Sequence, residues 1–549
     1  MTIMPGNQRL LAAATMFTAV AMAVSPAMAQ CAGDNGGLTL APGFCATVFA
    51  DNLGHVRHMV VAPDGTLYAT SWGAAYYRPT SDGAFQIALR DTTGAGRADV
   101  VRRFGASPGK GGAGGTGIGF HKSGLYVEEK DRILRYELPA GQLVPTGEPS
   151  VVVSGLPITG NHPMHPFGIS ARSDLFVDLG SITNVCNSDD PCTEKKTRAG
   201  IWRYDADKTG QVFSARERYA SGLRNGEGFA FDAAGRAYVT QHGRDQLQGW
   251  QRFYTLEQGA ELPAEEVVEL KQGADYGWPE CYYDQDQKKL VLAPEYGGNG
   301  GKKVGLCAER QGPVAAFPGH WAPNDLAIYL GTRFPAAYRG GLFVAFHGSW
   351  NRAPLPQGGY NVVFQPMADG KTAGPYIVFA DGFAGAYKEP GRAAHRPTGL
   401  AVAPDGALFI SDDVKGRIWR VTYQGGSSSA TGPAQVSAPP TERKVPLPIP
   451  PGSTAEQVAA GDRLYHAQAC IGCHGSDGAG TPVGPPLKAD AFAWSDGSVA
   501  GIASIIEKGV PKPKRYRGAM PPSGGAQLSK EQLAEMAAYV WALSHANNR

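Results

Sequence analysis

The sequence predicts an all-β six-bladed β-propeller followed by a small all-α domain. Three observations support this fold class: a strand–turn–strand pattern occurs six times between residues 40 and 424, a Gly/Ser/Pro-rich tract follows it, and residues 454–549 carry apolar side chains at helical spacing. The chain has 549 residues, whereas a usual domain has about 100 to 200, so more than one core is expected.

The repeated pattern consists of an apolar stretch, a turn and an alternating apolar strand. The two clearest copies, residues 60–69 and 400–410, both carry the turn Pro-Asp-Gly, and a third-strand pattern such as Ile-Trp-Arg follows some copies. Four weaker copies span residues 117–127, 167–177, 228–239 and 326–344. Period-two strands that recur at this spacing are typical of a propeller, in which a four-stranded sheet repeats radially. An array of β-sandwiches is the alternative, because six copies alone do not prove that the ring closes.

Residues 1–29 are expected to form a secretory signal peptide. Arg9 carries a positive charge, residues 10–24 are apolar, and Ala27-Met28-Ala29 offers a small-x-small cleavage site. A retained membrane anchor is the alternative, but the apolar run is shorter than the about 20 residues that a spanning helix needs. We therefore expect a periplasmic protein with no membrane span after cleavage. The net charge of +2 favours neither nucleic acid nor an anionic membrane as a partner.

The eight cysteines agree with export. Two lie in a Cys-x-x-Cys-His motif, and the other six are close in sequence as three pairs: Cys31 with Cys45, Cys186 with Cys192, and Cys281 with Cys307. Six cysteines allow 15 connectivities, so this local pairing is the simplest prediction rather than a deduction. Disulfides persist in an oxidising compartment such as the periplasm.

A boundary is expected after the repeats. The propeller domain is predicted over residues 30–424, and residues 425–453 form a Gly/Ser/Pro-rich linker that lacks the apolar periodicity of a core. Helical spacing then begins near Thr454, and Ser529 with Gln532 three residues later forms a capping-box pattern before a closing helix.

The motif of Cys470, Cys473 and His474 predicts covalent haem attachment. Two cysteines at this spacing reach the two vinyl groups of one porphyrin, and the adjacent histidine ligates the iron. A zinc or redox Cys-x-x-Cys site is the alternative, but no second ligand pair is present. Residues 454–549 are therefore expected to be a small all-α cytochrome c domain that contains haem c.

Met520 is the expected sixth iron ligand. It lies in the segment Gly-Ala-Met-Pro-Pro, where a thioether on a proline-stiffened loop can fill the open position and raise the potential. A buried core methionine is the alternative, although such residues usually occur in apolar periodic runs. Two protein ligands would leave the iron suited to electron transfer.

Histidines and arginines gather in loops at equivalent ends of the predicted blades. They occur within residues 160–165, 224–228, 241–245, 346–352 and 395–398. A polar turn explains any one of them. Several cations that converge at one opening would repel each other, however, unless an anionic ligand compensates. The set therefore predicts a binding site for an anion at one end of the propeller axis.

Across residues 42–423 the sequence resembles the soluble pyrroloquinoline-quinone-dependent aldose and sorbosone dehydrogenases, which are six-bladed propellers of the bacterial periplasm. The most specific elements are residues 224–225, 273–279, 347–352 and 395–413. The fit is closest to the sorbosone-dehydrogenase-like branch, and a cytochrome at the C-terminal end is a known type of fusion in this family.

The resemblance implies roles for individual residues. His162 would be the general base, with His165 as its competitor for that role. The residues that would contact pyrroloquinoline quinone are Arg224, Asn225, His242, Arg352 and Arg396. The backbone carbonyls of Gly243 and Arg244 would ligate a calcium ion that also touches the quinone.

The sequence departs from the family pattern at several positions. The family commonly has proline and then glutamine or histidine after the Arg-Asn pair, whereas Gly226 and Glu227 stand here. His242 replaces a glutamine, and Arg244 replaces a proline. Thr398 stands where the family has a second arginine, for which Arg352 would compensate. These departures bear on the cofactor pose and on the choice of substrate.

The residue types suit one reaction. Arginines bind the three carboxylates of the quinone in bidentate fashion, calcium accepts oxygen ligands, and a neutral histidine can take a proton from a substrate hydroxyl. We expect a periplasmic quinohaemoprotein dehydrogenase that oxidises an aldose, a sorbosone-like compound or another aldehyde or polyol. Its electrons would pass through its own haem to a downstream acceptor, such as a cytochrome or a membrane oxidase.

Two alternatives remain at this point. A non-enzymatic propeller could bind a glycan or a protein and use the haem domain as an electron relay. A quinone-linked enzyme could instead act on a different substrate, such as an alcohol.

Overall fold

The computed structural model describes residues 1–2, 31, 33–72, 84–107, 114–139, 141–186, 192–352, 355–425, 447–467, 470–474, 478, 480, 484–489, 492–511, 513, 520, 522–525 and 528–546. Nearly all of the predicted signal peptide and most of the predicted linker lie outside these residues.

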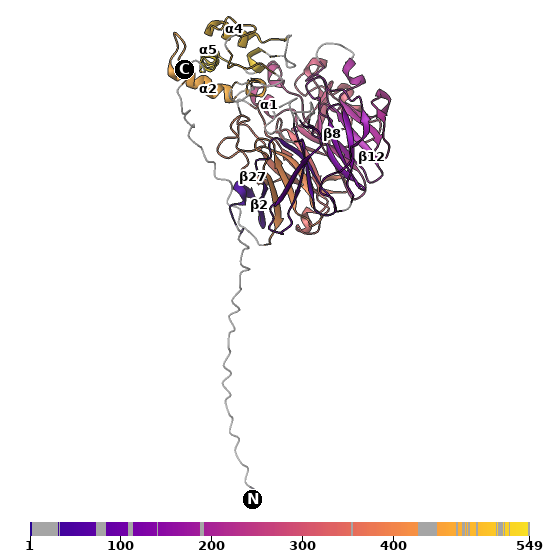
Figure 1. Cartoon of the computed structure of the whole chain (residues 1–549). Helices are drawn as coiled ribbons and strands as arrows, with labels where there is room; N and C mark the ends of the chain where they lie inside the picture. Colours follow the sequence, from indigo (N-terminus) through magenta and orange to yellow (C-terminus); the bar gives the residue numbers. More distant parts are fainter. Residues whose placement is uncertain are drawn as a thin grey trace.

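The propeller prediction is confirmed, since six antiparallel blades contain all six copies of the repeat as their two inner strands (Figure 1). Blades one and two consist, from the inside outward, of β3 (Val56–Val61), β4 (Leu67–Ser71), β5 (Gln86–Arg90) and β6 (Val100–Phe104), then β7 (Ile118–His121), β8 (Gly124–Glu129), β9 (Arg132–Glu137) and β10 (Ser150–Ser154). Blades three and four consist of β11 (Phe167–Ile169), β12 (Asp174–Leu179), β13 (Gly200–Asp205) and β15 (Arg218–Ser221), then β16 (Gly226–Phe231), β17 (Ala237–Gln241), β18 (Glu265–Glu269) and β21 (Ala315–Phe317). Blade five consists of β22 (Pro323–Ile328), β23 (Leu342–Phe346), β24 (Asn361–Gln365) and β27 (Ile377–Asp381).

The sixth blade closes the ring with a strand from the other end of the domain. It contains β28 (Pro397–Val402), β29 (Leu408–Asp412) and β30 (Ile418–Tyr423), and its outermost strand is β2 (Phe44–Ala50). Phe44 pairs with Tyr423 and Ala50 pairs with Ile418. The innermost strands of the sixth and first blades, β28 and β3, are also in contact. A closed ring excludes the sandwich array.

Short elements decorate the blades. β1 (Thr39–Leu40) and β14 (Gln211–Val212) extend two blades at their edges, while β19 (Cys281–Asp284) pairs with β20 (Lys289–Leu292) and β25 (Met367–Ala368) pairs with β26 (Lys371–Thr372). The short helices of the propeller are η1 (Asn35–Gly37), η3 (Thr193–Lys196), η4 (Ala215–Glu217), η5 (Leu247–Gly249), α1 (Leu256–Glu261), η6 (Pro294–Tyr296), η7 (Gly305–Glu309) and η8 (Ala336–Tyr338). The three predicted disulfides are confirmed: Cys31–Cys45, Cys186–Cys192 and Cys281–Cys307.

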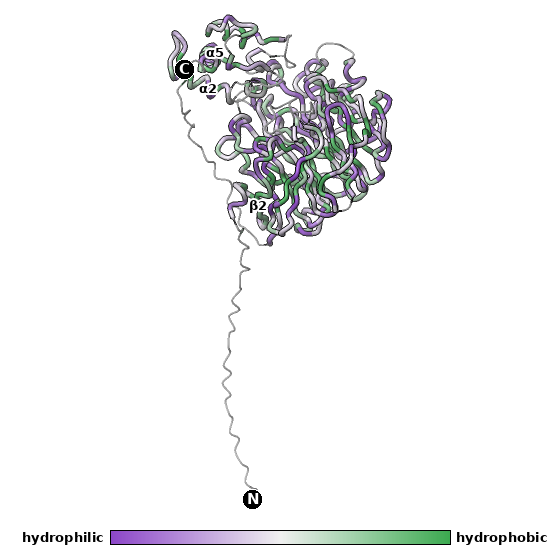
Figure 2. The backbone as a smooth tube through the Cα atoms, in the orientation of Figure 1, coloured by the Kyte–Doolittle hydropathy of each residue, from purple (hydrophilic) through white to green (hydrophobic). Residues whose placement is uncertain are grey.

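Apolar side chains alternate along the strands and pack between neighbouring blades. Trp202 and Trp419, in the third strands of blades three and six, have no exposed surface. In Figure 2 the hydrophobic residues gather along the blades and the hydrophilic ones along the connecting loops. Because the strands of a blade alternate in direction, the loops from a second to a third strand and the loops from an outermost strand to the next innermost strand all lie at the same end of the ring.

The C-terminal part is helical, as predicted. It contains α2 (Ala455–Ala467), α3 (Cys470–His474), α4 (Val499–Lys508), η9 (Pro522–Gly525) and α5 (Lys530–Ser544). The capping box at Ser529 and Gln532 is confirmed, and α2 and α4 both contact α5. Within the described part of the chain, no helix is long and apolar enough to cross a membrane.

Helices α2 and α5 cross closely at Gly461. A Cβ atom added to Gly461 would lie 2.0 Å from the carbonyl oxygen of Glu535 and 2.7 Å from the Cβ atom of Tyr539. The rings of Tyr465 and Tyr539 pack with centroids 5.2 Å apart. The crossing therefore depends on the absence of a side chain at residue 461.

We expect Gly461→Val to force these helices apart and to lower the free energy of unfolding of the helical domain by about 1–3 kcal/mol, which is typical of overpacking. Ala459→Val, on an exposed position of the same helix, is the matched control and should cost no more than about 0.7 kcal/mol through helix propensity. Thermal unfolding followed by circular dichroism compares the two. Equal losses would show that the crossing tolerates a side chain.

Candidate functional site

The predicted polar residues gather at one end of the propeller, where each innermost strand begins and each second strand ends. Arg224 and Asn225 precede β16, and Arg396 precedes β28. His242 and His347 directly follow β17 and β23. His162 lies in the loop that leads to β11. Because all these loops lie at the same end of their blades, the closed ring brings them together.

Arg224 is the centre of a buried network in the fourth blade. Its guanidinium donates to the Gly243 carbonyl oxygen at 3.0 Å, to Asp245 Oδ2 at 2.8 Å and to the Asn184 carbonyl oxygen at 3.2 Å. Asn351 Nδ2 donates to Asp245 Oδ1 at 2.8 Å. Burial works against the Asp245 carboxylate, but the charge of Arg224 together with His320 and the hydrogen bond from Asn351 outweighs it and lowers the pKa of Asp245. Asp245 is therefore an ionised partner of Arg224.

A second chain of contacts crosses from the fifth blade to the first. His347 Nε2 lies 2.8 Å from Asp413 Oδ1, and Arg57 Nη1 donates to Asp413 Oδ2 at 2.8 Å. The guanidinium of Arg57 stacks 3.8 Å above the ring of Trp72. Burial and the charge of Arg396 lower the pKa of His347 to about 4. This histidine is thus neutral at pH 7 and fixed by a carboxylate.

Arg396 points its guanidinium at the backbone of the same region. It donates through Nε to the His347 carbonyl oxygen at 2.9 Å and through Nη2 to the Gly348 carbonyl oxygen at 2.7 Å. An arginine has five N–H groups, and among the described residues only these two bonds from its guanidinium are formed. Arg396 therefore retains donors for an anionic ligand.

His162 is half-buried, and one of its ring nitrogens is already engaged. Its Nδ1 lies 3.0 Å from both the carbonyl oxygen and the Oγ atom of Ser181. Burial and the nearby charge of Arg224 hold the pKa of His162 well below its ordinary value. A neutral imidazole with a free Nε2 has the properties of a general base.

His165, the competitor for that role, is fully buried. Its Nε2 lies 3.0 Å from the carbonyl oxygen of Pro157, and its Nδ1 lies 3.4 Å from Glu128 Oε1. Both nitrogens therefore face protein atoms, which suits a structural role and favours His162 as the accessible base.

Three other predicted residues have specific surroundings. His242 Nε2 lies 3.2 Å from the Pro323 carbonyl oxygen, and burial and Arg224 lower its pKa to about 3. The side chain of Arg244 pairs with Glu295 at 2.5 Å. Asn225 is buried, with its Nδ2 3.5 Å from Glu227 Oε1.

The structure does not bring the side chain of Arg352 into this set. Its guanidinium donates to the carbonyl oxygens of Ala260 and Gly319 and pairs with Glu261 at the end of α1. The expectation that Arg352 compensates for Thr398 therefore finds no support in its contacts.

Sequence reasoning missed Arg57 and assigned no role to Asp245, Asn351 or Asp413. Arg57 stands at the start of β3, and the strand register places it at the position of Glu227 in the fourth blade and Thr398 in the sixth. The alignment of the six repeats by their inner strands would have found it.

The charges of this end of the propeller fit an anionic cofactor. Arg57 pairs with Asp413 and Arg224 pairs with Asp245, each at 2.8 Å. The guanidinium of Arg396 instead donates to two backbone carbonyl oxygens and pairs with no carboxylate among the described residues. An anionic ligand would balance this charge.

The residues also fit calcium at the loop that follows β17. Oxygen atoms of Gly243, Asp245 and Asn351 lie in one connected network, and Asn351 Oδ1 is buried without a partner among the described residues. Calcium prefers such oxygen donors. The Gly243 carbonyl accepts a hydrogen bond from Arg224, so a cation bound there would compete with that bond.

The helical domain fits a covalently attached haem. Cys470 and Cys473 form no disulfide, and His474 is buried with its Nδ1 2.8 Å from the Pro485 carbonyl oxygen. This bond fixes the ring and leaves Nε2 for the iron, which is a usual arrangement of a ligating histidine. Met520 pairs with Val510 through the backbone and packs against the domain core.

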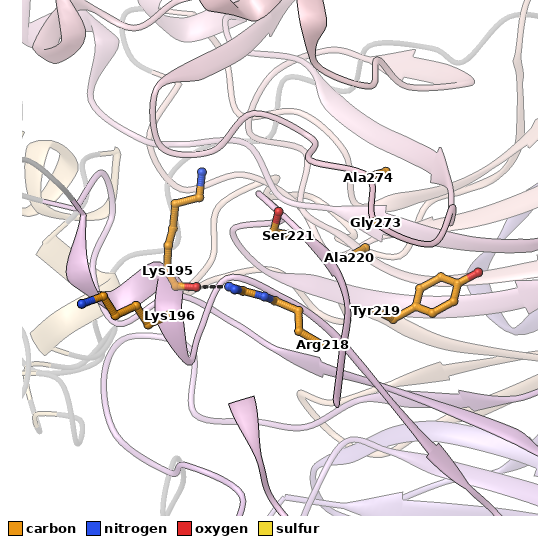
Figure 3. Close-up of a pocket in the computed structure, with 8 residues that line it drawn as sticks. All are labelled: Lys195, Lys196, Arg218, Tyr219, Ala220, Ser221, Gly273 and Ala274. Atoms are coloured by element: carbon orange, nitrogen blue, oxygen red, sulfur yellow. Dashed lines mark hydrogen bonds between the residues drawn. The ribbon is translucent and has the colours of Figure 1, made fainter. Parts of the chain in front are cut away.

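A different pocket, of about 280 Å³, lies at the outer edge of the third blade, beside β15. Figure 3 shows Lys195, Lys196 and Arg218 at its rim, with Arg218 bonded to the Lys195 carbonyl oxygen. Lys195 is neutralised by Asp275 at 3.2 Å and Glu280 at 3.1 Å. This pocket lies beside an outermost strand, so it is separate from the cluster of polar residues at the end of the propeller axis.

Comparisons with known proteins agree with this division. A family model described as TrAA12-like matches residues 38–424, and one described as cytochrome c oxidase, cbb3-type, subunit III matches residues 456–540. The pyrroloquinoline quinone-dependent pyranose dehydrogenase of Coprinopsis cinerea is 26% identical over 294 residues, which are 46% of this chain and 38% of that protein. The chain spans half or less of the length of the curated relatives that it matches.

Two solved structures share the propeller fold. The holo form of the quinone domain of the Coprinopsis cinerea pyranose dehydrogenase has a TM-score of 0.57 and 21% identity, over 70% of this chain and 97% of that one. The calcium structure of a Trichoderma reesei family AA12 enzyme has a TM-score of 0.57 and 18% identity, over 70% and 97% of the two chains. At these identities the likeness shows the fold alone.

Proposed function

The chain belongs to the TrAA12-like family through residues 38–424, and we propose that it is a quinohaemoprotein dehydrogenase that uses pyrroloquinoline quinone, calcium and haem c. The observation that carries this proposal is the Arg396 guanidinium, which pairs with no carboxylate among the described residues, at the same end of the propeller as a neutral, half-buried His162, in one chain with a Cys-x-x-Cys-His domain. The relative from Coprinopsis cinerea is named for the same quinone.

The proposed roles follow from the contacts. When bound, the quinone supplies an acceptor for a hydride and haem c supplies an acceptor for single electrons. Arg396, Arg224 and Asn225 hold the carboxylates and carbonyls of the cofactor, with His242 beside them. The carbonyl oxygens of Gly243 and Arg244 ligate calcium. Arg352 is not included among the cofactor-binding residues, because its guanidinium binds Ala260 and Glu261 at the end of α1.

His162 takes the proton of the substrate in this proposal. Its Nε2 has no hydrogen-bond partner within the described part of the chain. A neutral imidazole can accept the proton of a substrate hydroxyl as hydride leaves the carbon atom that carries this hydroxyl. Cys470 and Cys473 hold the haem, while His474 and Met520 ligate its iron.

A sugar is the favoured substrate class, because the curated quinone enzyme that the chain resembles is named a pyranose dehydrogenase. An aldose, a sorbosone-like compound or another aldehyde or polyol would meet the same requirement of a hydroxyl or hydrated carbonyl. We further propose a periplasmic location, with residues 1–29 removed, and a cytochrome or a membrane oxidase as the downstream acceptor. The three disulfides favour an oxidising compartment.

The proposed domain limits are 30–424 for the propeller, 425–453 for the linker and 454–549 for the cytochrome c domain. They are supported by the end of β30 at Tyr423 and the start of α2 at Ala455. A linker of this length would keep the haem domain at an effective concentration of the order of millimolar.

Reconstitution tests the function. The purified haem-containing chain is loaded with pyrroloquinoline quinone and calcium, and a panel of sugars and aldehydes is added while the haem absorption bands and a soluble dye acceptor are followed. Substrate-dependent reduction of both is expected. Failure of both, together with tight binding of a glycan, would favour a non-enzymatic binding module.

A further inference from the structure

Ser181 contacts the proposed base, His162, through two of its oxygen atoms. His162 Nδ1 lies 3.0 Å from the backbone carbonyl oxygen of Ser181 and 3.0 Å from its Oγ atom. The Ser181 hydroxyl in turn donates to the Thr183 carbonyl oxygen at 2.6 Å. Both oxygens of one buried serine thus converge on one nitrogen.

The positions of the hydrogen atoms follow from these contacts. A carbonyl oxygen can only accept, and a serine hydroxyl has one proton to donate, which is already given to Thr183. Each oxygen of Ser181 must therefore accept from His162, so Nδ1 carries the hydrogen. In a neutral imidazole the lone pair is then on Nε2.

The backbone around this serine and His162 is held by further hydrogen bonds. Its backbone N–H donates to the Arg224 carbonyl oxygen at 2.7 Å. Arg198 donates to the neighbouring Gly180 carbonyl oxygen at 2.6 Å and to that of His162 at 2.6 Å. Ser181 has no exposed surface. It therefore ties His162 in the third blade to Arg224 in the fourth.

We infer that Ser181 is the positioning residue of His162: it fixes the tautomer in which Nε2 is free to take a proton, and it couples the place of this base to that of Arg224. The inference rests on the proposed function of His162 as a base. A neutral partner is notable here, because a carboxylate at the same position would stabilise the charged imidazolium and raise the pKa of the histidine.

The other charges that act on His162 come from two neighbouring segments, at Arg224 and in the loop after β17. Arg224 and His242 lower its pKa, whereas Asp245 raises it. Asp245 is neutralised by its contact with Arg224 at 2.8 Å. Ser181 is thus the direct partner of Nδ1, and its replacement by an acid would change the strongest contact of the ring.

The tautomer can be measured without turnover. Nitrogen NMR of the full haem-containing chain, labelled in histidine and held in the reduced, diamagnetic state, separates protonated from unprotonated ring nitrogens, and His162→Gln assigns the signal. A protonated Nδ1 and an unprotonated Nε2 are expected at pH 7. The reverse pattern would overturn the inference whatever the activity.

Kinetics of the reconstituted enzyme give the second test. Ser181→Ala removes one of two acceptors and should lower kcat/KM about two- to tenfold, as expected for one hydrogen bond. Ser181→Asp should move the acid limb of the pH profile upward by about one unit or more. Ser349→Ala, at a buried serine bonded to Gln357 and Gly358, is the matched control and should leave the pH profile unchanged.

The outcomes distinguish a failure of the proposed function from a failure of the positioning role of Ser181. Absent dehydrogenase activity with a protonated Nδ1 would refute the proposed function and leave the tautomer assignment standing. Normal activity in Ser181→Ala, with an unmoved acid limb in a folded Ser181→Asp protein, would refute the positioning role. If Ser181→Asp does not fold, the alanine variant and the NMR signal of the natural chain still decide.

Discussion

Replacement of His162 by glutamine is expected to lower the substrate-dependent reduction of dye and haem about 10²- to 10⁴-fold, the usual contribution of a general base. Glutamine keeps a polar side chain of similar reach but cannot take a proton at neutral pH. The haem absorption bands should not change, because His162 belongs to the propeller. Stopped-flow spectrophotometry of the reconstituted chain measures both quantities.

The pH profile of the natural enzyme provides a further check on this residue. His162 must be uncharged to accept a proton, and burial together with Arg224 holds its pKa well below 6.5. Activity should therefore be retained as the pH falls through the ordinary range of histidine and should be lost only at lower pH. An acid limb centred near 6.5 would argue against His162 as the base.

Replacements of two further histidines serve as comparisons for His162→Gln. His121, at the end of β7, has its Nε2 3.0 Å from Ser173 Oγ, and His121→Gln should leave kcat/KM unchanged. His165→Gln should lower stability more than turnover, because both ring nitrogens face protein atoms. Normal turnover in His162→Gln with a loss in His165→Gln would transfer the catalytic role to His165.

Replacement of Arg57 by methionine is expected to destabilise the propeller by about 3–5 kcal/mol, the usual cost of removing one partner of a buried ion pair. Arg57 is 1% exposed and Asp413 is 2% exposed, so the remaining carboxylate would be buried with the contact to His347 but without its arginine. The stacking on Trp72 would be lost as well. Urea unfolding followed by circular dichroism measures the change.

An exposed ion pair is the matched control for this substitution. Lys122 and Asp207 lie 2.6 Å apart, but their side chains are 58% and 41% exposed. Lys122→Met should cost at most about 1 kcal/mol. Equal losses in the two variants would show that burial of the Arg57 pair has no special weight.

The effect of pH on the Arg57 pair has a definite sign. The charge of His347, the hydrogen bond with it and the charge of Arg57 outweigh burial and lower the pKa of Asp413 in the folded chain. The pair therefore contributes stability above the unfolded pKa of about 3.9, and this contribution is lost as the pH falls toward the lowered folded pKa. The difference between the natural chain and Arg57→Met should accordingly shrink in acid.

The blades could be predicted because the information for each inner hairpin is local. Residues 60–69 and 400–410 show both strands and the turn in about ten residues, and the disulfides also join residues that are close in sequence. The capping box at Ser529 is local as well. Patterns of this kind are visible in sequence because hydrogen bonding and side-chain alternation act between neighbours.

The rest of the site depends on contacts that no local pattern contains. Arg57 and Asp413 meet only because the ring closes. Arg352 ends a segment that resembles the family, yet its guanidinium donates to the Ala260 carbonyl oxygen near the end of α1. Ser181 is an ordinary loop serine in the sequence, and only the folded chain shows that both of its oxygens meet His162.

Because Phe44 pairs with Tyr423, the ring can close only late in folding. Contacts between residues so distant in sequence form slowly, because the whole intervening segment must first be ordered. Strand β2 would therefore stay unpaired until the sixth blade has been made. Cys45, which forms a disulfide with Cys31, lies on this strand. The helical domain begins only after this last blade, so the propeller ring can be complete before that domain has folded.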